Sequence, residues 1–107
     1  MSRFVLTEAD DGREVDVEPN DSLVVSLPEN PATGFLWTVA SETGGILELE
    51  NSDFSAAAGA GVGGGGRRVI SFRAATAGRA ILELVCRRPW ETDASAAGRY
   101  HLVINVR

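Results

Sequence analysis

The chain has no lysine, one cysteine and one histidine among its 107 residues, and these shortages exclude several classes of protein. A single cysteine, Cys86, cannot form an internal disulfide, so packing must hold the fold. One cysteine and one histidine are too few for a zinc site, and we expect no metal and no cofactor. The net charge of -5, with every cation an arginine and none in a long run, disfavours nucleic acid as a partner.

Apolar runs of membrane-spanning length are also missing, as is the apolar segment of a signal peptide after Met1. We therefore expect no membrane partner. The sequence as it stands predicts a cytoplasmic protein, or a periplasmic or secreted one if a leader was removed. A hydrophobic fraction of 44% with 23% charged residues is typical of chains that fold alone. The length suits one core, so we expect a single domain over residues 1–107 and a monomer.

Apolar alternation with a period of two is the dominant pattern, in short runs bounded by Gly, Pro, Asn and Asp. This pattern is typical of half-buried antiparallel strands, and no run has helical spacing. The candidate strands span residues 4–7, 13–17, 23–27, 35–40, 46–50, 67–74, 79–87 and 100–106. Seven or eight short strands with such turns predict an all-β sandwich of two sheets.

The alternation also assigns faces to the strands. The residues predicted to face the core are Ala80, Leu82, Leu84 and Cys86 in one strand and Leu102, Ile104 and Val106 in another. His101 then points to solvent, away from Cys86, so an inert cysteine is favoured over a catalytic Cys–His pair. Phe35, Trp37 and Val39 share a face, which favours Trp37 as a core aromatic over a contact residue. Glu48, Glu50 and Asp53 are best explained as a solvated edge.

Two segments interrupt the strand pattern. Residues 30–34, Asn-Pro-Ala-Thr-Gly, form a compact loop that Pro31 stiffens and in which Gly34 can adopt positive φ. Residues 56–66 contain only Ala, Gly and one Val, which predicts a mobile loop or a surface that binds through its backbone. Gly59, Gly61 and Gly64 fit the dinucleotide fingerprint G-x-G-x-x-G, but a strand rather than a helix follows, so the match is weak.

Three loop motifs together resemble one family. Residues 27–37, Leu-Pro-Glu-Asn-Pro-Ala-Thr-Gly-Phe-Leu-Trp, resemble the N-P-T-T-G-[FY]-x-W signature of chagasin-like inhibitors of cysteine peptidases, peptidase inhibitor family I42. The Gly-rich segment before Arg67 resembles that family's G-x-G-G loop, and Arg88-Pro89-Trp90 resembles its R-P-[WF] loop. The motifs occur in the family's order, and the resemblance extends from about Ser22 through Trp90.

The resemblance implies an immunoglobulin-like antiparallel β-sandwich that is not an enzyme. It also implies reversible, tight inhibition of papain-like cysteine peptidases of clan CA, family C1, by three adjacent loops that occlude the active-site cleft. The residues implied to bind the peptidase are Asn30, Pro31, Ala32, Thr33, Gly34, Gly63, Gly64, Gly65, Gly66, Arg88, Pro89 and Trp90. No catalytic residue is implied.

Two departures from the family pattern and two alternative functions accompany this prediction. Ala32 replaces the first threonine of the signature, so Thr33 carries the only hydroxyl of its loop. The Gly motif fits residues 63–66 without a gap, while residues 61–64 match its letters equally well. The same exposed loops could serve an interaction module that binds another kind of partner. An enzyme would instead depend on Cys86 or His101.

Overall fold

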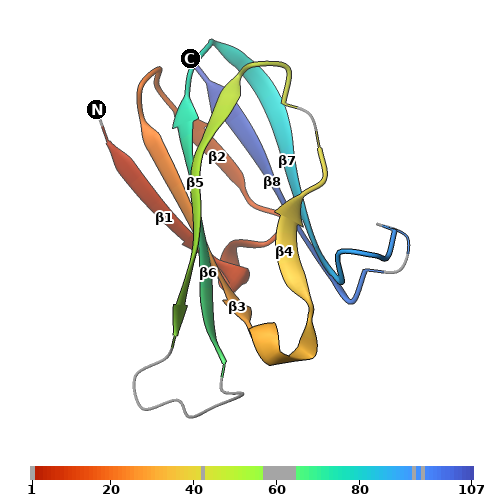
Figure 1. Ribbon diagram of the computed structural model, residues 1–107. Coiled ribbons are helices and arrows are strands. Elements are labelled where there is room, and N and C mark those ends of the chain that lie inside the picture. The colour runs from red at the N-terminus through yellow and green to blue at the C-terminus, as the bar shows by residue number, and fades with distance from the viewer. Residues whose placement is uncertain (1, 42, 57–64, 93, 95) are drawn as a thin grey trace.

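Strands of alternating polarity build the whole architecture (Figure 1). The computed structural model describes residues 2–41, 43–56, 65–92, 94 and 96–107. The strands are β1 (Arg3–Thr7), β2 (Glu14–Val17), β3 (Ser22–Glu29), β4 (Leu36–Val39), β5 (Leu47–Ala56), β6 (Gly66–Ala74), β7 (Gly78–Arg87) and β8 (Gly98–Val106). Two single-turn 3-10 helices, η1 (Glu8–Asp10) and η2 (Pro31–Thr33), follow β1 and β3.

The strands form two four-stranded sheets, with orders β1-β3-β6-β5 and β2-β8-β7-β4. The predicted sandwich of seven or eight strands is therefore confirmed. Four of the strand pairs are antiparallel, whereas β1 runs parallel to β3 and β2 runs parallel to β8. β1 and β2 flank η1 and belong to different sheets, so the two strands do not form a hairpin together. Alternation does not distinguish the two pairing directions, because the side-chain period is two in both.

The core lies between the two sheets and follows the predicted faces. Leu82, Leu84, Leu102 and Ile104 have no exposed surface, and Ala80 and Val106 are buried beside them. Burial of each large aliphatic side chain contributes about 1.5–3 kcal/mol, so this face dominates the stability of the fold. Cys86 continues it as a half-buried residue, and burial raises the pKa of its thiol.

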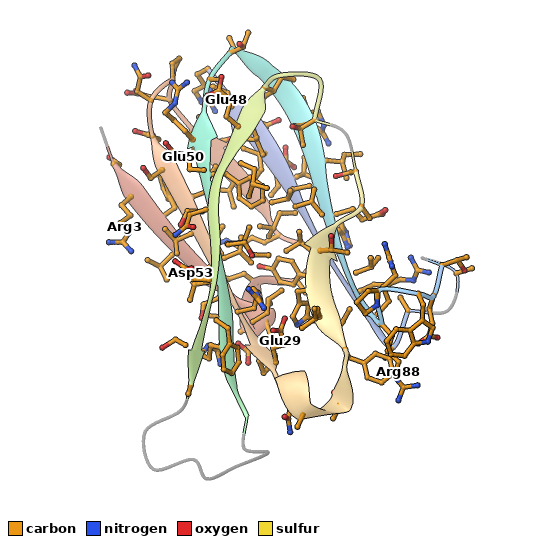
Figure 2. All side chains as sticks on the ribbon, viewed as in Figure 1. Arg3, Glu29, Glu48, Glu50, Asp53 and Arg88 are labelled. Carbon is orange, nitrogen blue, oxygen red and sulfur yellow. The ribbon has the colours of Figure 1, made fainter. Side chains whose placement is uncertain are left out.

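Strand β5 is longer than its prediction and is an edge strand. The predicted run ended at residue 50, but β5 continues to Ala56 and stays paired with β6 across a bulge between Leu49 and Asn51. Most of its side chains are exposed, and it is the last strand in the order of its sheet. Glu48, Glu50 and Asp53 lie along it, as expected for a solvated edge (Figure 2).

One end of the sandwich gathers the segments that the sequence analysis singled out. In the first sheet, Gly66 pairs with both Glu29 and Ala56, so β3 and β5 end where β6 begins. In the second sheet, Leu36 pairs with Arg87, so β4 begins where β7 ends. We call this the loop end, meaning the described parts of the β3–β4, β5–β6 and β7–β8 connections. It lies at the bottom of Figure 1.

Candidate functional site

The Asn30–Gly34 segment is braced by its own hydrogen bonds. The carbonyl of Asn30 accepts from the N–H of Thr33 at 3.1 Å and from its hydroxyl at 2.8 Å. The side-chain oxygen of Asn30 accepts from the N–H of Ala32 at 3.1 Å. Gly34 has a φ of 81°, in the left-handed region where a side chain adds strain. The loop is therefore shaped before it meets any partner, and the Thr33 hydroxyl is one of its internal braces.

Arg88 joins this loop to the segment after β7. Its guanidinium lies over the ring of Phe35, 4.5 Å from the centroid, and 5.9 Å from the centroid of the Trp90 ring. Its Nε also donates to the carbonyl of Thr33 at 3.3 Å. Cation–π contacts of this kind contribute about 0.5–1 kcal/mol each at exposed sites, so together they favour one arrangement of the two loops. Figure 2 shows Arg88 at the loop end, on the segment that follows β7.

Phe35, which was predicted to share a face with Trp37 and Val39, instead contacts Arg88. It precedes β4, which begins at Leu36, and among the described residues Trp37 and Val39 pack against the core whereas Phe35 does not. Trp37 itself is half-buried and packs against the core, in agreement with the core assignment. Its ring N–H donates to the carbonyl of Pro28 at 2.9 Å, which ties β4 to the neighbouring sheet.

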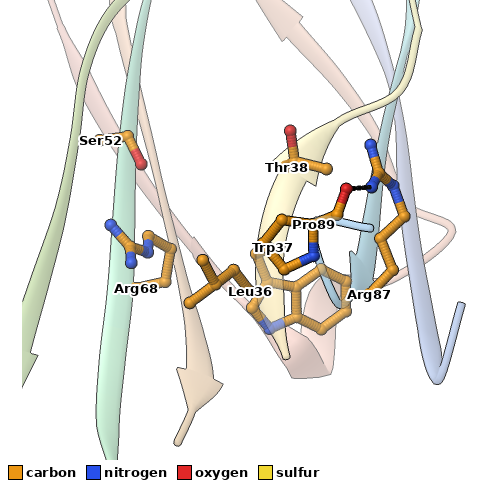
Figure 3. Close-up of a pocket in the computed structure, with 7 residues that line it drawn as sticks. All are labelled: Leu36, Trp37, Thr38, Ser52, Arg68, Arg87 and Pro89. Carbon is orange, nitrogen blue, oxygen red and sulfur yellow. Dashed lines mark hydrogen bonds between the residues drawn. The ribbon is translucent and has the colours of Figure 1, made fainter. Parts of the chain in front are cut away.

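Trp90 projects from the loop end with 75% of its surface exposed, a large value for an aromatic residue of this size. Arg87 stabilises the turn that carries Trp90 through hydrogen bonds to its backbone. The Nη1 of Arg87 donates to the carbonyls of Arg88 and Pro89 at 3.3 Å and of Glu91 at 2.8 Å. Figure 3 shows Arg87 beside Pro89. The sequence analysis did not identify this role of Arg87, since nothing in a single arginine predicts that it binds the carbonyls of the next turn.

Of the predicted Gly-rich motif, the described residues include Gly65 and Gly66. Gly63 and Gly64 lie outside the described residues, as does the whole alternative motif at residues 61–64, so both registers remain predictions. Gly65 lies against the start of the Asn30 loop, since a Cβ placed on it would be 3.7 Å from the carbonyl oxygen of Glu29. A Cβ on Gly66 would clash with the carbonyl oxygen of Ser55 and lie 2.7 Å from Cζ of Phe54. Glycine is therefore required at Gly66 by close packing.

The sequence analysis did not predict the buried ion pair of Glu29 and Arg68, which lies beside the loop end. Glu29 has a fully buried side chain that accepts from Arg68, with 2.8 Å between Nη2 and Oε1. The alternation did contain a signal for this pair. Glu29 follows Leu27 in the inward series of β3, and Arg68 precedes the inward Ile70 of β6. Two opposite charges at inward positions of paired strands indicate a buried ion pair.

A groove runs beside the loop end, between β4 of one sheet and β5 and β6 of the other (Figure 3). It has a volume of about 320 Å³. The residues that line it are Leu36, Trp37, Thr38, Ser52, Arg68, Arg87 and Pro89. Of its two arginines, Arg68 is paired with the carboxylate of Glu29, and Arg87 donates to backbone carbonyls of the turn that follows β7.

The only candidate catalytic pair of the sequence is separated in the structure. Cys86 pairs with Gly98 and His101 pairs with Glu83, at positions of odd separation, so the two side chains point to opposite faces of the sheet. Burial raises the pKa of Cys86, which keeps it a thiol rather than the thiolate that a nucleophile requires. Within the described ranges, no group of three or more His, Cys, Asp or Glu side chains could hold a metal ion. Nor does any described helix have the length and apolar character needed to span a membrane.

The described structure is thus a β-sandwich that carries braced loops and an exposed tryptophan at one end. The sequence profile of the chagasin family of peptidase inhibitors, I42, matches residues 16–104. The chain therefore belongs to the chagasin family, as its three motifs predicted, and this is a family of peptidase inhibitors rather than enzymes. None of the curated proteins with which the chain was compared matches it.

Solved structures agree with this assignment. The chain is similar to the cysteine protease inhibitor EhICP2 of Entamoeba histolytica, with a TM-score of 0.88 and 23% identity over 100% of this chain and 97% of that one. It is similar to amebosin, with a TM-score of 0.81 and 28% identity over 98% of each chain. It is also similar to the ICP of Leishmania mexicana, with a TM-score of 0.70 and 29% identity over 92% of this chain and 90% of that one.

Proposed function

We propose that this protein is a reversible, tight-binding inhibitor of papain-like cysteine peptidases of clan CA, family C1, and that it occludes their active-site cleft with three adjacent loops. The peptidase-binding residues are Asn30–Gly34, Gly63–Gly66 and Arg88–Trp90. Family membership supports the inhibitory activity. The observation that carries the three-loop mechanism is the contact of Arg88 with Thr33 and Phe35, which sets exposed Trp90 beside the Asn30 loop.

The braced loops account for tight binding in physical terms. An interface of standard size, about 1,600 Å², gives nanomolar affinity only when little ordering remains to be done on association. The hydrogen bonds of Asn30 and Thr33 have already ordered the first loop in the free protein. The hydrogen bonds from Arg87 to three backbone carbonyls have likewise ordered the turn that carries Trp90.

Each loop has a distinct part in the proposed mechanism. The Asn30–Gly34 loop enters the cleft and covers the catalytic cysteine and histidine of the peptidase. The Gly-rich segment pairs through its backbone with the edge of the cleft, as an added strand does, since glycine permits close approach of two backbones. Trp90 lies on the adjoining surface and supplies apolar contact area at a small cost in side-chain entropy. Inhibition then needs no covalent bond and no chemistry by this chain.

The test is a titration of the protein into papain and a cathepsin with a fluorogenic peptide substrate. We expect loss of activity at a stoichiometry near one to one, and recovery of activity on dilution. A serine peptidase such as trypsin serves as the control and should retain its full rate. Undiminished rates for several papain-like enzymes in stoichiometric excess of the protein would refute the proposal and favour an interaction module with another partner.

A further inference from the structure

The side chain of Glu29 connects its own strand, β3, to strands β4 and β6. Glu29 is the last residue of β3, and its carboxylate lies between the two sheets at the loop end (Figure 2). Oε1 accepts from Nη2 of Arg68 at 2.8 Å, and the Nε of Arg68 lies 3.2 Å from Oε1 and 3.1 Å from Oε2. Oε2 also accepts from the backbone N–H of Trp37 at 2.9 Å. The carboxylate thus has fixed partners on β6 and on β4.

These partners lie at the bases of two candidate loops. Glu29 directly precedes the Asn30–Gly34 loop, and Trp37 comes shortly after it, in the opposite sheet. Arg68 is two residues beyond Gly66, where the Gly-rich segment enters β6. The carbonyl oxygen of Glu29 also lies close to Gly65, at 3.7 Å from an ideal Cβ position. One ion pair therefore connects the exit and return of the first loop to the base of the second.

Stability alone does not explain a charged pair at these positions. Removing two charges from water costs several kcal/mol per ion, and apolar residues of similar volume often stabilise a core as well or better. Leu27 and Ile70 are the neighbouring inward residues of the same strands and are almost fully buried. The ion pair differs from apolar residues in being directional. The planar guanidinium of Arg68 and the N–H of Trp37 hold the Glu29 carboxylate in one orientation.

We infer that Glu29 and Arg68 are positioning residues for inhibition: they fix the angle at which the Asn30–Gly34 loop and the Gly65–Gly66 strand start leave the sandwich, without contacting the peptidase. This inference rests on the proposed function. The ion pair determines affinity through the loops that it holds, since a contact surface displaced at its base loses complementarity over its whole area.

The test replaces the pair by apolar residues in one double variant, Glu29→Leu/Arg68→Met. We expect the inhibition constant for papain to rise about tenfold or more while the thermal midpoint changes little. Amide hydrogen exchange should accelerate at residues 30–37 and 65–66 and stay unchanged in β7 and β8. The matched control is Glu48→Gln/Arg73→Gln, which removes an exposed ion pair between β5 and β6 at the far end and should leave the inhibition constant unchanged.

A folded double variant with an unchanged inhibition constant overturns the inference, whether or not its loops exchange faster. If the double variant does not fold, Arg68→Lys replaces it, since lysine keeps the charge but lacks the planar fork. That variant should also raise the inhibition constant at a retained midpoint, and no change in its constant overturns the inference as well. Failure of the wild-type protein to inhibit any peptidase is a different result, because it refutes the proposed function while the exchange data still report on loop positioning.

Discussion

Trp90 provides the sharpest test of the contact surface, because its contribution can be worked out from its exposure. A tryptophan presents up to about 250 Å² of surface, and 75% of the surface of Trp90 is exposed in the free protein. If half of that exposed area is covered by the peptidase, the gain is about 2.3 kcal/mol at ~25 cal/mol per Å². Ordering of the side chain offsets about 1 kcal/mol of this gain. Trp90→Ala should therefore raise the inhibition constant by a factor of about 10 if the whole offset applies, and by up to about 50 if none of it does.

The assay is the inhibition constant for papain, measured with a fluorogenic substrate beside the thermal midpoint of each variant. The matched control is Ile81→Ala, which removes another large exposed apolar side chain, 57% exposed, from the middle of β7. Ile81 lies six residues before Arg87, about 20 Å along the strand, so its removal should leave inhibition unchanged. An unchanged constant for Trp90→Ala at an unchanged midpoint would remove Trp90 from the contact surface.

Three further substitutions test other parts of the structure. Gly66→Ala should lower the free energy of unfolding by about 1–3 kcal/mol, because its Cβ would clash with the Ser55 carbonyl oxygen. Gly65→Ala is the control and should leave the free energy of unfolding unchanged. Equal thermal midpoints for the two variants would contradict the packing at Gly66. Cys86→Ser should lower the thermal midpoint through loss of a half-buried apolar contact but leave inhibition intact, and loss of inhibition by the folded variant would show a functional cysteine. Hydrogen bonds from the N–H groups of Glu18 and Ser2 lower the pKa of Asp21 below its unfolded value of about 3.9. Its contribution to stability is therefore present above that pH and lost as the pH falls below it, so Asp21→Asn should make acid unfolding less steep; an unchanged slope of stability against pH would refute this.

The sheets were largely predictable from the sequence because the polarity of a strand is a local property. The alternation in β7 and β8 identified the core residues, and the same rule separated Cys86 from His101. Pairing direction depends on which strands become neighbours. The parallel pairing of β1 with β3 and of β2 with β8 therefore could not be predicted.

The candidate site was predictable in part, for a related reason. The Asn30 and Trp90 segments were recognisable because their motifs are continuous in sequence, and the structure brings them together through Arg88. The ion pair of Glu29 and Arg68 joins residues that are 39 positions apart, so it depends on strand register rather than on a motif. Inward positions held by charged residues are the signal that would have found it.

The most direct test of the central claim is amide hydrogen exchange of this protein, free and in complex with papain whose active-site cysteine is blocked by a small methylthio group. We expect protection on binding at three places together: residues 30–34, the Gly-rich segment through Gly66, and residues 88–90. Protection that is instead confined to the far end, at the turns of Gly44–Gly45 and Ala77–Gly78, would contradict the account.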